Sequence, residues 1–277
     1  MTLLQNKLGR FYKYIYLLKF AFKKGSGGIL SVLLFQLGGM INIFGIVGVW
    51  IISNDPSKYQ SLATVFSFLL IGRLMYSLVD GMYHIGVSSD INSGRLSNQL
   101  LLPTPYHLWA LGKDTGFKLF QISTTIFGNI LTIIIFSKFI NLNFEWGRNF
   151  WFTAGLLPLM YVIRLIIGWI IGYLAFFTKN KRDMDGIHFS IIMSLFYFVG
   201  TYLPIYKIIE RFPFMSFLEY LPTAFLIHHP MKIYSNLYSN DQILLTYLGA
   251  LGWALILWIT AKIVFKLGLK QYESVGL

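Results

Sequence analysis

The sequence predicts an all-α integral membrane protein, a single domain over residues 1–277 that crosses the bilayer six times. Hydrophobic residues make up 56% of the chain and charged residues only 12%, about half the charged share of a soluble protein. The mean hydropathy is +0.62. Six segments are apolar over about 20 residues, the length that a helix needs to cross a bilayer. This composition argues against a soluble enzyme, a disordered protein and a coiled coil.

Residues 1–25 predict an amphipathic helix at the membrane surface. Apolar residues recur there at alternating steps of four and three, which places them on one stripe of an α-helix. Most of the basic residues fall off this stripe, so we expect the helix to lie in the cytoplasmic headgroup layer with its apolar face down. A soluble helix docked on a partner is the alternative. The stripe consists of Leu4, Leu8, Phe11, Ile15, Leu18 and Phe22.

The six predicted spans are expected to be helical, because lipid offers backbone groups no hydrogen-bond partner. In the fourth span, Pro158 predicts a kink. The GxxxG pattern of Gly168 and Gly172 predicts close packing within the chain rather than a dimer seam. The spans run from about Ile29 to Ile52, Leu62 to Val79, Leu119 to Phe136, Phe150 to Phe177, Ile187 to Ile205 and Ile243 to Leu267.

Basic residues set the orientation of the chain. They concentrate in the N-terminal segment, after the second span (Arg95, Lys113 and Lys118), after the fourth span and in the C-terminal tail. By the positive-inside rule, both termini are therefore cytoplasmic. We attribute the net charge of +12 to this orientation and to anionic lipid, not to nucleic acid.

The cytoplasmic segment after the second span, residues 81–113, is too long for a simple connection. We expect one short helix in it, stopped by Pro103 and Pro105. Such a helix is a natural docking surface for a partner protein, with a plain connector as the alternative. The leucines expected on its docking face are Leu96, Leu100 and Leu101.

The segment before the last span, residues 206–242, is too apolar for an exposed loop on the outer side. Prolines at positions 204, 213, 222 and 230 divide it into pieces of about eight residues, none long enough to span. We expect short interfacial or re-entrant helices that close a pathway at its outer end. The candidate residues of this outer gate are Pro213, Glu219, Pro222 and Pro230.

Polar residues inside spans are costly, which makes them functional candidates. Arg73 and Asp80 share a face of the second span, and either is expected to meet Arg164 or a hydroxyl group on a neighbouring helix. A structural ion pair is favoured over a contact with the substrate. Asn42 in the first span needs a hydrogen-bond partner, such as its counterpart across a dimer.

We predict neither a catalytic site nor a metal site. Asp80 and His84 have the spacing of a ligand pair but lack a third ligand nearby, so His84 is interpreted as a capping residue at the membrane edge. The rings of His228 and His229 are expected to diverge on a helix.

Three stretches together resemble the membrane subunit of ABC-2 type exporters, in the branch of bacterial drug and antibiotic export permeases. The first, 94–103, is similar to the family's glycine, leucines and proline after the second span. The second, 220–230, resembles its proline-alanine-proline stretch before the last span, with His228 and His229 where aromatic residues are commoner. The third is the tail, 268–276.

The resemblance implies a set of parts and partners. Residues 1–25 would be the elbow helix, and 206–242 the outer gate. Two permease chains, as a homodimer or a heterodimer, would pair with two ABC ATPase subunits that bind ATP–Mg, in the inner or plasma membrane of a prokaryote. The chain has no G-x-x-x-x-G-K-[ST] loop of its own. The coupling helix received by the ATPase would contain Gly94, Arg95, Leu96, Leu100, Leu101 and Pro103.

The function that these features favour is that of an exporter permease moving amphiphilic, drug-like or lipid-like cargo. A six-span secondary transporter or channel without an ATPase is the alternative. It predicts internal repeats with broken helices at matching positions, and the sequence shows no convincing repeat. An intramembrane enzyme, the third hypothesis, needs catalytic groups clustered at one depth.

Overall fold

The computed structural model describes residues 15–23, 71–72, 74–81, 83–137, 147–178, 186, 190 and 205–272. These residues form helices and turns, and no strand occurs among them, which confirms the all-α class. The first predicted span lies outside the described residues, and so does the fifth apart from Ser190 and Ile205. The count of six spans therefore stays a prediction.

Ten helical elements can be bounded within the described ranges. Four of them are short α-helices or 3-10 helices between residues 205 and 234. In chain order the elements are α4 (Tyr83–Asn92), α5 (Arg95–Leu100), α6 (Tyr106–Ser137), α7 (Arg148–Tyr173), η2 (Leu174–Phe177), α9 (Ile205–Arg211), η3 (Pro213–Tyr220), η4 (Pro222–Leu226), α10 (His228–Tyr234) and α11 (Asn240–Leu269).

Two helices are long and apolar enough to cross a membrane, by length and composition. They are α7 continued by η2, Arg148–Phe177, and α11, Asn240–Leu269. They coincide with the fourth and sixth predicted spans. Helix α7 continues through Pro158. Helix α11 begins with a capping box in which the side chains of Ser239 and Gln242 each accept a hydrogen bond from the other's backbone N–H.

The third predicted span lies in α6, which is much longer than the span itself. This helix has 32 residues and begins at Tyr106, inside the segment predicted to be a cytoplasmic loop. The short helix expected in that segment is α5, Arg95–Leu100, and the structure adds α4 and the start of α6 to it. Pro105 does not only stop a helix: its carbonyl group accepts hydrogen bonds from the N–H groups of Leu108 and Trp109 at the start of α6. A proline fits this place because the first helical N–H groups have no intrahelical acceptor.

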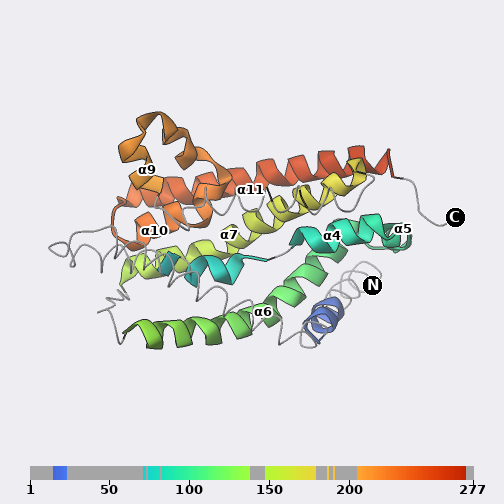
Figure 1. Ribbon diagram of the computed structural model, residues 1–277, viewed down its shortest axis with the longest axis horizontal. Coiled ribbons are helices and arrows are strands. Elements are labelled where there is room, and N and C mark those ends of the chain that lie inside the picture. Colours follow the sequence, from blue (N-terminus) through green and yellow to red (C-terminus); the bar gives the residue numbers. More distant parts are fainter. Residues whose placement is uncertain are drawn as a thin grey trace, which may run out of the picture.

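The long helices lie roughly along one axis, with the short elements at opposite ends (Figure 1). Helix α7 contacts α4, α10 and α11 and is mostly buried. Helix α11 exposes large apolar side chains along its length, as expected for a helix that faces lipid. The segment 15–23, α5 and the last turn of α11 lie at one end, whereas α9 and α10 lie at the other (Figure 1).

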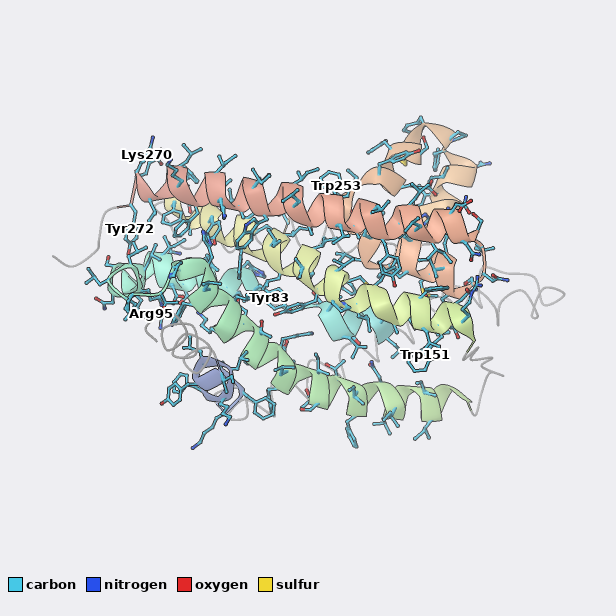
Figure 2. The ribbon with its side chains drawn as sticks, turned by 180° about the vertical axis from the view of Figure 1, so that it is seen from behind. Tyr83, Arg95, Trp151, Trp253, Lys270 and Tyr272 are labelled. Atoms are coloured by element: carbon cyan, nitrogen blue, oxygen red, sulfur yellow. The ribbon has the colours of Figure 1, made fainter. Side chains whose placement is uncertain are left out.

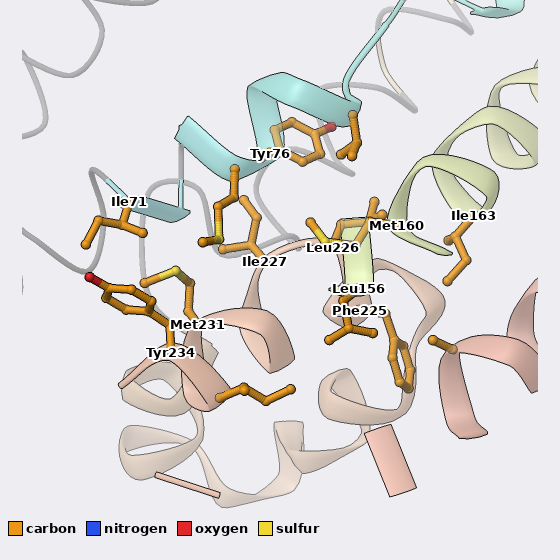
Figure 3. Packing of buried hydrophobic residues seen from close by; sticks show 14 of the residues in the cluster. Ile71, Tyr76, Leu156, Met160, Ile163, Phe225, Leu226, Ile227, Met231 and Tyr234 are labelled. Carbon is orange, nitrogen blue, oxygen red and sulfur yellow. The ribbon is translucent and has the colours of Figure 1, made fainter. Parts of the chain in front are cut away.

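Two apolar clusters follow α7 from end to end. Around its first half, side chains from residues 71–79, α10 and η4 surround Met160 and Leu156 (Figure 3). Around its second half, Trp169 and Tyr173 pack with side chains from α4, α6 and the end of α11. Helix α7 is therefore the common support for the elements at both ends of the molecule.

The described part of the N-terminal helix, residues 15–23, packs on α6. A Cβ atom on Gly116 of α6 would lie 2.8 Å from the Cβ atom of Ala21, so the two helices approach closely. The rings of Phe22 and Phe120 also meet edge to face at 5.7 Å. The position of this helix in the headgroup layer stays a prediction.

Candidate functional site

The candidate coupling site begins with the turn between α4 and α5. Gly94 has a φ of 72°, in the left-handed region that favours glycine. Its N–H group donates to the carbonyl group of Ile91, and its own carbonyl group accepts from the N–H group of Ser97. The glycine of the predicted coupling motif therefore lets the chain leave α4 and start α5 at once.

The leucines predicted to form one docking face are divided between two surroundings. Leu96 is fully buried, in the first turn of α5, and belongs to the aromatic cluster around α7. Leu101, just beyond the end of the helix, is 85% exposed. The expectation of one shared face was therefore wrong: α5 is only six residues long, so its first turn packs on the core while its end protrudes. The exposed tip consists of Leu100, Leu101, Leu102 and Pro103.

Asp90 ties three helices together behind this tip. Its carboxylate accepts a hydrogen bond of 2.9 Å from Lys113 of α6, and lies 3.3 Å from the guanidinium group of Arg95 in α5. Arg95 also donates to the hydroxyl group of Ser89. Arg95, predicted as a coupling residue, therefore holds α5 on α4. Asp90 was not predicted, because a single acid in a polar loop gives no periodic signal.

The segment that follows α11 contacts α5. The hydroxyl groups of Tyr272 and Ser97 lie 3.3 Å apart, and the ring of Tyr272 meets Phe176 edge to face at 5.7 Å. Tyr272 and Arg95 lie at the same end of the molecule, far from Trp151 (Figure 2). The predicted coupling motif and the tail motif are thus in direct contact.

A buried polar cluster lies deeper, where the chain enters α4. The guanidinium group of Arg164 in α7 donates to the carboxylate of Asp80 and to the carbonyl oxygen of Gly81, each at 2.9 Å. Tyr76 also donates to the Asp80 carboxylate, at 3.2 Å. Of the four intramembrane candidates, the structure brings Asp80 and Arg164 together as an ion pair. Arg73 and Asn42 lie outside the described residues, and the functional role of all four stays a prediction.

Lys118 is the member of this cluster that the sequence did not indicate. It was expected among the bases of the cytoplasmic loop, but it is 2% exposed and donates to the carbonyl oxygens of Ser77 and Asp80. The reason is that α6 begins earlier than predicted and carries this side chain inward, to the backbone of residues 77–80. Lys118 lies in the sequence between a charged loop and an apolar span, a position from which its burial could not be predicted.

Helices α4, α6 and α7 form one closely connected unit near this cluster. Gly168 and Gly172 of α7 face Tyr83 and Val87 of α4, where an added Cβ atom would lie 2.8 Å from each neighbouring Cβ. This confirms that the GxxxG pattern packs within the chain. Polar side chains also link α6 to α7 in three pairs, which are Asp114 with Trp169, Thr115 with Tyr161 and His107 with Tyr173.

The interpretation of His84 changes with this packing. Asp80 is bound by Arg164 and precedes the start of α4, so Asp80 and His84 do not share one helical face. His84 is buried against α7, and its position at the membrane edge stays a prediction. Within the described ranges, no group of three or more His, Cys, Asp or Glu residues is placed to hold a metal ion.

At the opposite end, the proline-bounded segment forms short helices, as predicted. Pro213 and Pro222 stand at the first position of η3 and η4, where the missing N–H group is harmless. Pro230 lies in the first turn of α10, and its carbonyl oxygen accepts from the hydroxyl group of Thr153 in α7. Their place in the membrane, and their role as a gate, stay predictions.

Glu219 is the centre of a polar cluster that joins η3 to α10. Its carboxylate accepts from Lys232 at 2.8 Å and from Nε2 of His228 at 3.0 Å. His229 donates from Nε2 to the Glu219 carbonyl oxygen, while its Nδ1 accepts from the hydroxyl group of Tyr238. The expectation of diverging histidine rings was wrong: their centroids are 5.2 Å apart, because Glu219 offers an acceptor to each.

Burial sets the protonation states of this outer cluster. It lowers the pKa of His228 to about 4, with repulsion from His229 and Lys232 acting in the same direction. Burial also lowers the pKa of His229. For Glu219, burial would raise the pKa, but the hydrogen bonds and charges of Lys232 and His228 outweigh it and lower the pKa. Both histidines are therefore neutral near pH 7, and the His228–Glu219 contact is a hydrogen bond from a neutral ring.

Comparison with known proteins identifies the family of this chain. No curated protein matches the sequence. A family model described as ABC-2 family transporter protein matches residues 56–276, which include both apolar long helices, the α4–α5 turn and the short outer helices. ABC-2 permeases are the membrane subunits of ABC transporters, generally without catalytic activity, and associate with an ABC ATPase. The chain belongs to the ABC-2 family of transporter proteins.

Proposed function

We propose that this chain is the permease of an ATP-driven exporter that moves amphiphilic, drug-like or lipid-like cargo outward across the plasma membrane of a prokaryote. The observation that carries the proposal is the exposed apolar tip of residues 100–103 on a member of the ABC-2 family. Three consecutive leucines with 42%, 85% and 48% exposure are unusual at a cytoplasmic end unless a partner covers them. An ABC ATPase is the partner expected of a member of the ABC-2 family.

In this proposal the tip of α5 is the coupling helix that enters the ATPase surface. Two permease chains, identical or related, pair with two ATPase subunits, and ATP–Mg binds in the ATPase. Movement of the tip reaches α4 through Asp90 and Arg95, and reaches α11 through Ser97 and Tyr272. These contacts support a coupling helix of fixed position: Arg95 ties α5 to Asp90 of α4, Asp90 is bound in turn by Lys113 of α6, and Ser97 ties α5 to Tyr272.

The outer helices are proposed as the gate that closes the pathway. Their cluster at Glu219 links η3 to α10, and Thr153 links α10 to α7. Movement of α7 would therefore reach the outer segment directly. A cluster in which the Glu219 charge is paired with Lys232 and the two histidines are neutral also suits a gate that must close against apolar cargo without exposing unpaired charge.

Leu101→Asp tests the assignment of the tip. A carboxylate placed in an apolar docking surface stays unpaired and is expected to weaken ATPase binding by about 2 kcal/mol, more than tenfold. The double variant Leu100→Asp/Leu101→Asp should abolish co-purification of the ATPase subunit from membranes. Both leucines are exposed, so the permease itself should fold and insert normally.

Leu237→Asp is the matched control. Leu237 is 60% exposed but follows α10, so the same charge lies at the other end of the molecule and should leave co-purification unchanged. If the Leu100 and Leu101 variants retain the ATPase as the wild type does, the tip is not the docking surface. If the wild-type chain never captures an ATPase, the proposed function is wrong.

A further inference from the structure

Three lysines form a row near the end of α11. Lys262, Lys266 and Lys270 follow one another at steps of four residues, which places neighbouring members about 6 Å apart on adjacent turns. All three are exposed. Lys270 directly follows the helix and keeps helical backbone angles, with a φ of −70° and a ψ of −23°. It lies at the same end of the molecule as Tyr272 and Arg95 (Figure 2).

The lysine row continues the exposed apolar face of α11. Leu244 precedes Lys262 by about five whole helical turns, so the two side chains leave the helix in the same direction. Leu251, Leu255 and Ile259 lie within about 60° of that direction. These four apolar residues are between 49% and 61% exposed. The lysines therefore stand on the side of α11 that is expected to face lipid in the preceding turns.

The length of the helix places the lysine row at the level of the lipid headgroups. The apolar stretch of α11 begins at Ile243, and the hydrocarbon core corresponds to about 20 helical residues, so the core ends near Lys262. The headgroup layer adds about 5–7 Å on each side of the core. Lys266 lies about 6 Å beyond Lys262 along the axis, and Lys270 about 12 Å. Long lysine side chains at this depth extend to the phosphate groups.

Trp258 gives the first lysine of the row a defined position. The amino group of Lys262 lies 5.1 Å from the centroid of the Trp258 ring, in a cation–π contact. That ring packs in turn against His107 of α6 at 5.6 Å and against Trp169 of α7 at 6.2 Å. Burial lowers the pKa of His107, and the charge of Lys262 acts in the same direction. His107 is therefore neutral near pH 7, and the positive charge beside Trp258 belongs to Lys262.

No carboxylate neutralises the lysine row within the part of the chain that the structure describes. The ion pairs found there involve Asp80, Asp90 and Glu219, and none includes a member of the row. Basic side chains beside a membrane attract acidic lipids, each by about 1 kcal/mol. An acidic surface of the ATPase is the competing partner. The face shared with Leu255 and Ile259 favours lipid, because a protein seated there would displace the acyl chains.

We propose that Lys262, Lys266 and Lys270 form a binding site for the headgroup of an acidic phospholipid in the cytoplasmic leaflet. The lipid phosphate pairs with the amino groups of Lys262 and Lys266, and the acyl chains lie along Leu255 and Ile259. Lys270 extends the site toward the aqueous side of the headgroup layer. This inference goes beyond the proposed function and is independent of it, since the lipid binds without an ATPase.

Quenching by brominated lipids tests the site in vesicles that contain the full-length permease. The chain has no cysteine, so a bimane label on Ile259→Cys reports only the lipid next to the lysine row. The same label on Leu244→Cys reports the other end of the same face. The two positions are about 22 Å apart along the axis, less than the hydrocarbon thickness of about 30 Å, so both reach acyl chains. The vesicles contain phosphatidylcholine and phosphatidylglycerol, with bromine on the chains of one lipid or the other.

The site predicts a local preference for phosphatidylglycerol. Next to Ile259→Cys, phosphatidylglycerol should be preferred over phosphatidylcholine by about fivefold or more, the factor that one basic residue near the surface contributes. Next to Leu244→Cys, the two brominated lipids should quench equally. The absence of a preference at Ile259→Cys, or the same preference at both positions, would overturn the inference.

Lys262→Gln/Lys266→Gln tests whether the lysines cause the preference, with Lys19→Gln/Lys23→Gln as the matched control. The control removes the same charge from the segment 15–23 at the same end of the molecule (Figure 1). All four lysines are exposed, so both variants should fold. The first variant should remove the preference at Ile259→Cys, and the control should keep it.

Two outcomes with these variants would contradict the site. Equal losses in both variants would show a general surface potential instead of a defined site. A preference that survives Lys262→Gln/Lys266→Gln would show that other residues select the lipid. If the wild type shows no preference but this variant loses the co-purified ATPase, the lysine row belongs to the ATPase interface, which overturns the lipid site and leaves the proposed function intact.

Discussion

Single side chains decide how the outer segment responds to acid, because His228 is 2% exposed and its pKa is lowered to about 4 by burial. In the unfolded chain its pKa returns to about 6.5. Between these values the unfolded chain binds the extra proton and the folded chain does not, so stability falls as the pH drops from about 6.5 to about 4. The lowered pKa of Glu219 acts in the same direction at still lower pH.

His228→Gln is expected to reduce this acid sensitivity. Glutamine keeps an N–H donor for Glu219 but does not titrate, so the part of the loss due to His228, up to about 2 kcal/mol by pH 5, should disappear. The measurement is thermal unfolding of the purified protein at about pH 7.5 and about pH 5. Identical losses in the variant and the wild type would show that His228 is not the group responsible.

For single residues, the sequence indicated some of the important charged residues but not the groups that they bind. Arg164 and Asp80 are conspicuous because ionisable residues are rare within apolar runs, and the structure pairs them. Asp90 lies among polar residues and Lys118 at the edge of an apolar run, so only tertiary packing shows that both are buried. No local pattern encodes which carbonyl group a lysine will reach across two helices.

Between elements, glycines set the distance from α7 to α4. A Cβ atom at Gly172 would lie 2.8 Å from the Cβ atom of Val87 and 2.9 Å from the carbonyl oxygen of His84, which is backbone and cannot rotate away. Gly172→Ala is therefore expected to destabilise the protein by about 1–3 kcal/mol through overpacking. Thermal unfolding in detergent measures the loss.

Gly252→Ala in α11 is the control for this substitution. No atom lies within 4 Å of an added Cβ at Gly252, so alanine should be neutral or slightly stabilising there through its higher helix propensity. A Gly172→Ala variant as stable as Gly252→Ala would mean that α4 is not pressed against α7.

The helices were predictable from the sequence where residues such as proline mark their first positions. Prolines at 213 and 222 begin short helices because φ is preset and the first N–H group needs no partner. The start of α6 was not predictable in the same way. Its first half mixes polar, aromatic and small residues, a composition found both in a solvated loop and in a helix that packs on its neighbours. The hydrogen bonds to Trp169 and Tyr173 favour the helix.

For the whole molecule, the predicted orientation depends on how basic residues divide between the two ends. The end with α5, the segment 15–23 and the last turn of α11 carries Lys19, Lys23, Arg95, Lys266 and Lys270, whereas Arg148, Arg211 and Lys232 belong to the end with α9 and α10 (Figures 1 and 2). Helices α7 and α11 join these ends and are long enough to cross the bilayer. The orientation of the chain in the membrane is inferred from the distribution of lysine and arginine in the sequence.

Single cysteines at Asn98 and Ser216 test this orientation in intact cells. Both residues are exposed, one on α5 and the other on η3, and the cysteine-free chain gives no background. A membrane-impermeant maleimide should label the Ser216→Cys variant from outside and leave Asn98→Cys unlabelled until the membrane is opened. The charge asymmetry favours this orientation over the inverted one, because every translocated lysine or arginine near a span opposes insertion. Labelling of Asn98→Cys in intact cells would invert the topology, and with it the assignment of α5 to the ATPase.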